Sequence, residues 1–401
     1  MEGRTPGGTA ARLKKAHWTR YVGLCKARRP PAQRPYIQGM NWLVAAAGLA
    51  LLLVVLWDAF ETVVLPRRVN RRVRLTRLFY RATWRPFAAS ARLVRPGNRR
   101  EAYLSFYGPL SLLFLLALWA TGLVTAFGFL QYAITGDFAT DLYMSGTTFF
   151  TLGLGDVAPH GALARLLTVV ESGLGFGFLA IVIGYFPVLY QAFSRREVSI
   201  SLLDGRAGSP PSAGQLLHRH RGPGGVVALE RLLREWEQWS AELLETHLSY
   251  PLLAYYRSQH NNQSWLAALT TVLDTSALMM VGGDAAEGGG CARQARLTFA
   301  MARHAVVDLA QVFRTEPRPP AADRLPPPLL AQLRTELAAS GFHLAEGAAV
   351  DAGLVRLREM YEPYVEALSR YLLQPLPAWH QDAPRRDNWQ TSAWDRKRVS
   401  D

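Results

Sequence analysis

The feature that most constrains the fold is a set of three long apolar runs, with one short apolar segment between the second and the third. The long runs cover residues 41–65, 103–134 and 163–193. A helix needs about 20 apolar residues to cross the hydrocarbon core of a bilayer, and each run is long enough. The short segment, residues 139–150, would form a helix of about 18 Å, which spans half a bilayer. We therefore predict three transmembrane helices and one helix that enters the membrane and returns.

The short segment leads into a loop in which glycine alternates with leucine, Thr151-Leu152-Gly153-Leu154-Gly155-Asp156. Non-helical backbone at membrane depth is tolerated only where it is buried in protein or lines water. A strand whose carbonyls all point to one side needs positive φ angles at intervals, which glycine adopts at little cost. Gly153 and Gly155 fit that need, and Asp156 places negative charge at the outer mouth. The loop is therefore predicted to be the selectivity filter of a cation channel.

Rings of backbone carbonyls replace the water around a dehydrated potassium ion in such filters. We expect K⁺ to be bound by the carbonyls of Thr151, Leu152, Gly153 and Leu154 and by the Thr151 hydroxyl. The C-terminal partial negative charge of the preceding short helix favours a cation in the central cavity. One filter per chain provides one quarter of a ring, so the sequence predicts a homotetramer.

The segment between the first two runs sets the predicted orientation. Residues 66–100 carry twelve arginines and no acidic residue, in a chain of net charge +14. Cytoplasmic loops carry an excess of basic residues, and Arg195 and Arg196 after the third run follow the same rule. The filter is then expected to face outward and the C-terminal half to be cytoplasmic, in a multi-pass protein of the plasma (inner) membrane.

Apolar residues interleave with these arginines, which predicts an amphipathic segment lying on anionic lipid headgroups. Nucleic-acid binding is disfavoured because both neighbouring segments are membrane helices.

Acidic residues inside or beside a span are costly and point to function. Asp58 and Glu61 close the first run and are predicted to pair with Arg67 and Arg68 at the interface. The alternative is a role in coupling this helix to gating.

Within the third run, Glu171 is expected either to line the pore or to brace the filter from behind. Pairing with a polar neighbour at the outer interface is the alternative. Gly175, one turn further along, is a candidate gating hinge, and close helix packing is the other explanation for the glycines of this run.

The rest of the chain differs in composition. Residues 1–39 are predicted to be a disordered basic segment, with Met40 as an alternative natural start. The first span is assigned to 40–65, the pore module to 101–195 and a Gly/Pro/Ser/Arg-rich linker to 196–225. A helical cytosolic domain follows over 226–376, and a polar tail over 377–401. An amphipathic helical pattern runs from Leu229 to Leu243, and further helices of that domain are expected at 249–282, 293–314, 327–340 and 351–374.

Residues 265–282 are apolar enough to suggest a fourth span. Asp274 at their centre, with Thr270, Thr271, Thr275 and Ser276 around it, favours a buried helix of a soluble domain instead. Cys25 and Cys291 are far apart and imply no disulfide framework.

The sequence Thr151-Leu152-Gly153-Leu154-Gly155-Asp156 resembles the potassium-channel signature Thr-Val-Gly-Tyr-Gly-Asp. The order of outer helix, pore helix, filter and inner helix over about 103–193 resembles the two-helix pore module of prokaryotic potassium channels. Arg165 and Gly175 fall where family members often have an arginine and a hinge glycine. The resemblance implies an all-α membrane protein that conducts potassium passively. Leu154 departs from the usual aromatic residue, and Thr147 stands where many members carry an acidic one.

Other function classes find less support. The chain has no Walker loop, no Gly-x-Gly-x-x-Gly after a strand, no His-Glu-x-x-His and no cysteine cluster, so neither an enzyme nor a cofactor is predicted. The alternatives are a weakly selective monovalent cation channel and, in a different class, a membrane-anchored helical signalling or scaffold protein. The sequence names no regulatory ligand.

Overall fold

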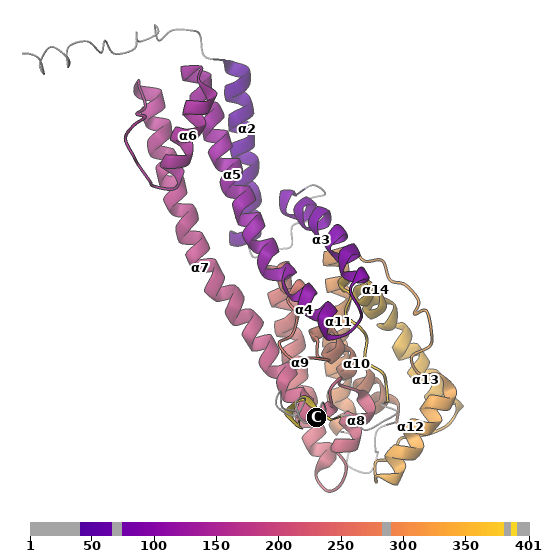
Figure 1. Cartoon of the computed structure of the whole chain (residues 1–401). Helices are drawn as coiled ribbons and strands as arrows, with labels where there is room; N and C mark the ends of the chain where they lie inside the picture. Colours follow the sequence, from indigo (N-terminus) through magenta and orange to yellow (C-terminus); the bar gives the residue numbers. More distant parts are fainter. Residues whose placement is uncertain (1–40, 66–73, 283–289, 381–385, 391–401) are drawn as a thin grey trace, which may run out of the picture. The chain divides into compact units, whose positions relative to one another are not determined.

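The computed structural model of the chain describes residues 41–65, 74–282, 290–380 and 386–390 (Figure 1). Within those residues the regular structure is helical throughout and contains no strand, so the all-α prediction is confirmed. Four described helices are long and apolar enough to cross a membrane, judged by length and composition: Trp42–Val64, Asn98–Thr135, Ala162–Ala207 and Trp265–Gly282. The first three contain the predicted spans.

The chain divides into two compact units. One comprises residues 1–50 and 124–172, and the other comprises residues 51–123 and 173–401. The three boundaries between the units run through long helices, so α2 (Trp42–Ala59), α5 (Tyr107–Thr135) and α7 (Ala162–Ala207) each contribute to both units.

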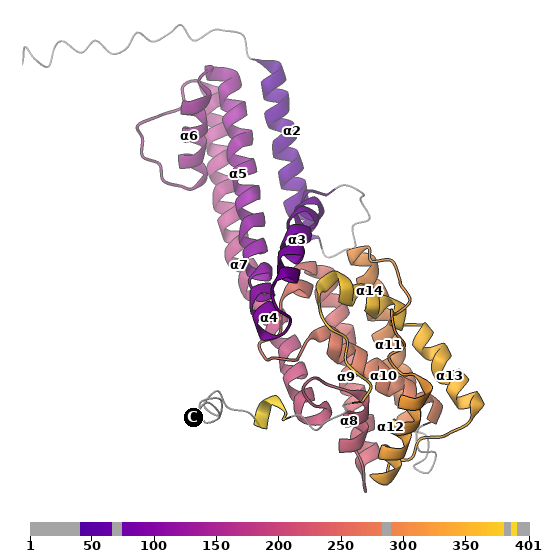
Figure 2. The same cartoon turned by 45° about the vertical axis from the view of Figure 1, so that its right-hand side comes forward.

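In the larger unit, α9 (Gly225–Ser249), α10 (Trp265–Gly282) and α11 (Gly290–Phe313) lie side by side (Figure 2). Their apolar faces form one core, to which Leu229, Trp236, Trp265 and Phe299 contribute. Around it are the shorter elements α8 (Ala213–Arg219), the 3-10 turn Pro251–Tyr255, α12 (Pro327–Ala339), α13 (Ala348–Glu359), α14 (Glu362–Leu372) and a last 3-10 turn, Asn388–Gln390.

The predicted helices at 293–314 and 327–340 match α11 and α12 within a few residues, whereas two others are interrupted. The single helix expected over 249–282 is broken after Ser249, because Pro251 cannot continue the hydrogen-bond ladder. The helix expected over 351–374 divides into α13 and α14 at Tyr361, just before Pro363. The predicted linker 196–225 also differs. Its first part continues α7, and Leu216 and Leu217 of α8 are buried in the core.

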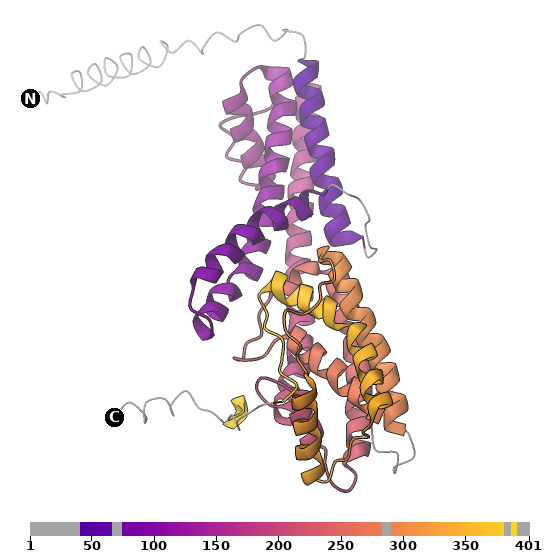
Figure 3. The ribbon, with the colours of Figure 1, turned by 90° about the vertical axis from the view of Figure 1, so that its right-hand side faces the viewer.

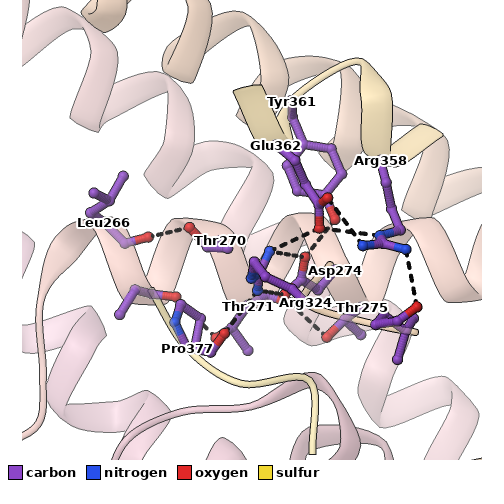
Figure 4. A network of polar contacts seen from close by, with 12 residues as sticks. Leu266, Thr270, Thr271, Asp274, Thr275, Arg324, Arg358, Tyr361, Glu362 and Pro377 are labelled. Atoms are coloured by element: carbon purple, nitrogen blue, oxygen red, sulfur yellow. Dashed lines mark hydrogen bonds and ion pairs between the residues drawn. The ribbon is translucent and has the colours of Figure 1, made fainter. Parts of the chain in front are cut away.

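Helix α10 is enclosed by its neighbours, in agreement with the prediction of a buried helix over 265–282. Asp274 at its centre accepts hydrogen bonds from both terminal nitrogens of Arg324, at 3.3 and 2.6 Å, and from the Tyr361 hydroxyl (Figure 4). Arg324 also contacts Glu362 at 3.2 Å, and Glu362 in turn binds Arg358. Burial lowers the pKa of Arg324, but the charge and hydrogen bond of Asp274 together with the charges of Tyr361 and Glu362 outweigh burial, so the net shift is upward.

In the smaller unit, the beginning of α2 packs directly on the end of α5 (Figure 3, indigo and purple). A Cβ at Gly48 would lie 2.9 Å from the Ala126 carbonyl oxygen and 3.0 Å from the Phe129 Cβ, so the absence of a side chain permits this approach. The Asn41 N–H also donates to the Ala133 carbonyl at 3.1 Å. Helix α6 (Phe138–Phe149) and the beginning of α7 complete the unit.

The basic segment 66–100 is helical over α3 (Leu75–Leu93), and part of its apolar stripe is buried against protein. Trp84, Ala88 and Ala91 are buried in the core of the larger unit, and the Trp84 indole donates to the Tyr371 carbonyl at 3.0 Å. These residues are spaced four and three apart and share one helix face, as an amphipathic helix requires. Leu78 and Leu93 stay exposed, so contact of this segment with lipid headgroups stays a prediction. A short helix, α4 (Asn98–Ser105), follows.

The acidic residues at the end of the first span have partners other than those predicted. Asp58 accepts from the backbone N–H and the hydroxyl of Thr76, at 3.1 and 2.6 Å, and from the Trp119 indole at 3.0 Å. Asp58 thereby caps the N-terminus of α3, although it lies 18 residues before Thr76 in the sequence. Glu61, on the π-helical turn Phe60–Val64, pairs with Arg74 at 3.4 Å. Arg67 and Arg68, the predicted partners, lie outside the described residues.

The two arginines after the third apolar run differ in burial. Arg196 is buried and donates to the carbonyls of Leu253 at 2.8 Å and Tyr256 at 3.0 Å. Its Nη1 also lies 3.3 Å from His247 Nε2. Arg195 is exposed.

Candidate functional site: the loop after helix α6

Helix α6, Phe138–Phe149, lies close to the predicted short helix 139–150. Its first turn is capped by Asp137, which accepts from the Thr140 N–H at 3.4 Å and from the Thr140 hydroxyl at 2.9 Å. Asp141 is tied to the Thr135 hydroxyl at the end of α5. Twelve residues at 1.5 Å each give about 18 Å, so this helix covers half a membrane.

The chain leaves α6 through the backbone of Thr147. The Thr147 carbonyl accepts the N–H of Leu152 at 2.8 Å and, more weakly, that of Gly153 at 3.4 Å. The Thr147 hydroxyl bonds within its own helix, to the Met144 carbonyl at 3.0 Å. At the position where the resemblance places an acidic residue, this chain therefore uses a main-chain oxygen to hold the start of the loop.

Within the loop the sign of φ alternates. Thr151, Gly153 and Gly155 have φ of 57°, 56° and 77°, while the leucines between them do not have positive φ. Such alternation turns successive carbonyls to one side of an extended segment. At Gly153 and Gly155 an added Cβ would meet no atom within 4 Å, so the requirement for glycine comes from the backbone angle and not from space. Thr151 adopts positive φ although it is β-branched, which marks it as strained.

Asp156 at the end of the loop is held by Tyr143 of α6, whose hydroxyl donates to its Oδ2 at 3.0 Å. The sequence singled out Asp156 for the outer mouth of the loop but did not identify Tyr143. The signal was weak, because Tyr143 is one of several aromatic residues in the segment. Tyr143 lies thirteen residues before Asp156, and the two side chains meet because the chain reverses direction after α6.

Glu171 of α7 is almost fully buried, with 1% of its surface exposed. Its Oε1 accepts from the Ser145 hydroxyl on α6, which also lies 2.8 Å from the Val124 carbonyl of α5. Within the described residues Glu171 Oε2 has no hydrogen-bond partner. The hydrogen bond from Ser145 fits two of the expectations, bracing of the filter from behind and pairing with a polar neighbour, and the role of Glu171 stays a prediction. Ser145 was not singled out from the sequence.

Gly175 lies one turn beyond Glu171, in a helix that continues unbroken from Ala162 to Ala207. It is buried, whereas Gly173, Gly177 and Gly184 have open space where a Cβ would stand. The hinge role of Gly175 therefore stays a prediction. Along the same helix, large apolar side chains at seven-residue spacing are exposed: Val169, Phe176, Ile183 and Tyr190.

Comparisons with known proteins agree with this geometry. Residues 112–191, which contain α6, the loop and most of α7, match the ion channel family. Over 184 residues the chain is 27% identical to the uncharacterized membrane protein YdjJ of Bacillus subtilis (strain 168), an alignment that covers 43% of this chain and 52% of the relative. The chain thus spans about half the length of that curated relative. No solved structure gives a significant match. Residues 112–191 are therefore similar to an ion channel domain, and the chain resembles a membrane protein over 184 residues.

Proposed function

We propose that the chain is one subunit of a homotetrameric channel that conducts potassium ions passively across the plasma membrane. The observation that carries the proposal is the alternation of positive φ at Thr151, Gly153 and Gly155, directly after a helix half a membrane long. In this arrangement the carbonyls of Thr151 to Leu154 and the Thr151 hydroxyl would ligate the ion. Neither a catalytic group nor a cofactor is part of this mechanism.

The tetramer follows from the single loop per chain. A ring of carbonyls needs four copies around one axis, and each chain supplies one loop. The exposed apolar stripe on α7 supports assembly, because large apolar side chains repeated every seven residues suit contact with neighbouring inner helices or lipid. Chemical cross-linking of the protein in its native membrane is expected to yield species up to a tetramer and none larger.

The test of the function is ion flux into liposomes that contain the purified tetramer. A potassium gradient is expected to drive flux that sodium does not support. Absence of flux for either ion under all gating conditions would contradict the channel and favour a helical signalling or scaffold protein. Equal flux of the two ions would retain the channel and assign it weak selectivity. That outcome has a specific basis, because Leu154 places no aromatic ring or hydroxyl behind the filter.

Substitution of the filter glycine sharpens the test. Gly153→Ala adds a Cβ to a residue at φ 56°, and we expect loss of conduction with the tetramer preserved. Gly136→Ala is the matched control. It introduces the same substitution at φ 82°, also with open space around the Cβ, but in the turn before α6. If the two variants conduct alike, the loop is not the filter.

A further inference from the structure

The larger unit contains a cavity of about 1020 Å³ that the proposed conduction path does not use. Its walls come from the π-helical turn after α2, from α3, from the beginning of α5, from the end of α11 with the segment after it, and from α14. All of its lining residues belong to this one unit. A volume of this size is at the upper end of ligand pockets in proteins.

The cavity is strongly basic. Eight arginines and two glutamates line it. Glu61 is already engaged by Arg74, and Arg370 is engaged by Glu366 outside the cavity. In the part of the chain that the structure describes, Arg81, Arg85 and Arg314 make no ion pair with a carboxylate. Several guanidinium groups therefore share one cavity without matching negative charge from the protein.

The mutual repulsion of these groups is visible in the pKa of Arg77. Burial lowers this pKa, and the charges of Arg314 and Arg74 lower it further. Arg77 lies on α3, while Arg314 follows the end of α11, so the two cations are brought together by the fold and not by sequence proximity. A bound anion would relieve this repulsion. Arginine forks match the oxygen geometry of phosphate in particular.

One wall of the cavity is apolar. Leu112, Leu115 and Leu116 come from α5, a helix long and apolar enough to cross a membrane, and Leu252 faces them from the 3-10 turn after α9. A ligand that fills both parts needs phosphate groups and a hydrocarbon portion. Basic pockets beside membrane helices suit the headgroups of anionic lipids for this reason.

We propose that this cavity is a binding site for a phosphate-bearing anion, with the arginines of α3 and Arg314 holding the phosphates and the α5 leucines contacting an acyl chain. The site joins α3, which Asp58 caps at the end of α2, to the C-terminal helical domain. Its existence does not depend on conduction through the loop after α6. A ligand there would contact both membrane-spanning and domain helices of the same unit.

The test measures binding by the full chain in detergent. The lipid probe is cardiolipin, which carries two phosphates on one acylated molecule, with phosphatidylcholine, a zwitterion without net charge, as the comparator. The soluble probe is pyrophosphate. The pocket variant is the double substitution Arg81→Gln/Arg85→Gln, and the control is Arg195→Gln/Arg231→Gln, which removes two exposed arginines that do not line the cavity.

We expect wild type to bind cardiolipin in preference to phosphatidylcholine, and the pocket variant to bind it at least about tenfold more weakly while the control stays within about twofold. Pyrophosphate that binds with the same dependence on Arg81 and Arg85 and displaces cardiolipin would assign the site to free phosphate compounds. Binding of cardiolipin alone would assign it to lipid. Equal binding of each probe by the two double variants would overturn the proposal.

A second measurement does not depend on the folding of a variant. Wild-type protein is labelled with a photoreactive cardiolipin and the cross-linked peptides are identified. Label on peptides from 75–93 and 311–318, reduced by unlabelled cardiolipin or by pyrophosphate, supports the site. Label that never reaches these two segments overturns it.

Discussion

Two carboxylates are buried in apolar helices of this chain, and their surroundings differ sharply. Asp274 of α10 is fully enclosed and receives two hydrogen bonds from Arg324 and one from Tyr361. Glu171 of α7 is equally enclosed but receives a single bond from Ser145, and among the described residues nothing pairs with its second oxygen. The fold therefore pairs Asp274 with a cation, whereas it leaves one oxygen of Glu171 without a hydrogen-bond partner among the described residues.

The difference teaches how to interpret an acidic residue in an apolar run. A buried ion pair with complete hydrogen bonding contributes to the specificity of a fold. Removing one partner is destabilising, because the other charge is then buried without compensation. A buried polar atom without a partner requires another explanation, such as a functional role. Asp274 accordingly belongs to the architecture of the helical domain, and Glu171 belongs to the candidate site.

The largest loss of stability is expected at the ion pair between Asp274 and Arg324, because this carboxylate has the most complete set of partners. Arg324→Leu would leave Asp274 without its paired cation, whereas Glu362 would keep its contacts with Arg358. We expect a loss of about 3–5 kcal/mol in the stability of the helical domain. The measurement is the thermal unfolding midpoint of the full chain in detergent. Arg234→Leu is the control, since it breaks an exposed pair with Glu230 that is worth under about 1 kcal/mol. Equal midpoints for the two variants would show that the network around Asp274 is not structural.

A histidine, His247, is also buried and titratable. His247 is enclosed beside Arg196; burial, and then the charge of Arg196, lower its pKa to about 3. Its Nδ1 bonds to the Leu243 carbonyl at 2.8 Å, which leaves Nε2 to accept from Arg196. Glu197 binds the same guanidinium at 2.9 Å. The histidine is therefore neutral in the folded chain at pH 7.

This depressed pKa predicts a pH dependence of stability. Between pH 6.5 and about 3 the unfolded histidine is protonated and the folded one is not, so stability falls as the pH is lowered through this window. One group contributes up to about 1.4 kcal/mol per pH unit. The measurement compares the unfolding midpoints of wild type and His247→Gln from pH 7 to pH 4. Other groups titrate in both proteins, so the difference between the two curves reports on His247. Parallel curves would contradict the low pKa of His247.

How much of the fold and of the candidate site the sequence could predict depends on the distance between partners. Helix lengths are local properties, so the three long apolar helices and the short helix α6 were predicted close to where they lie. The partners of the buried charges were not. Asp58 meets Thr76 and Trp119 at separations of 18 and 61 residues, and Asp274 meets Arg324 across 50. A pattern can show that an acid is buried, but only the fold determines what satisfies it.

The smallest effect on stability, and the most informative about function, is expected at Glu171. Glu171→Gln keeps the shape of the side chain and an oxygen for the Ser145 hydroxyl, so we expect the unfolding midpoint to change by less than the equivalent of about 1 kcal/mol. It also removes the ionisable carboxyl group behind α6, and we expect potassium flux per tetramer to change several-fold in liposomes. Ser145→Ala is the companion variant, because it removes the only described donor to Glu171 and keeps the carboxyl group. A Glu171→Gln variant with wild-type flux and a clearly lowered midpoint would place Glu171 with Asp274 as a structural group and remove the distinction between the two carboxylates.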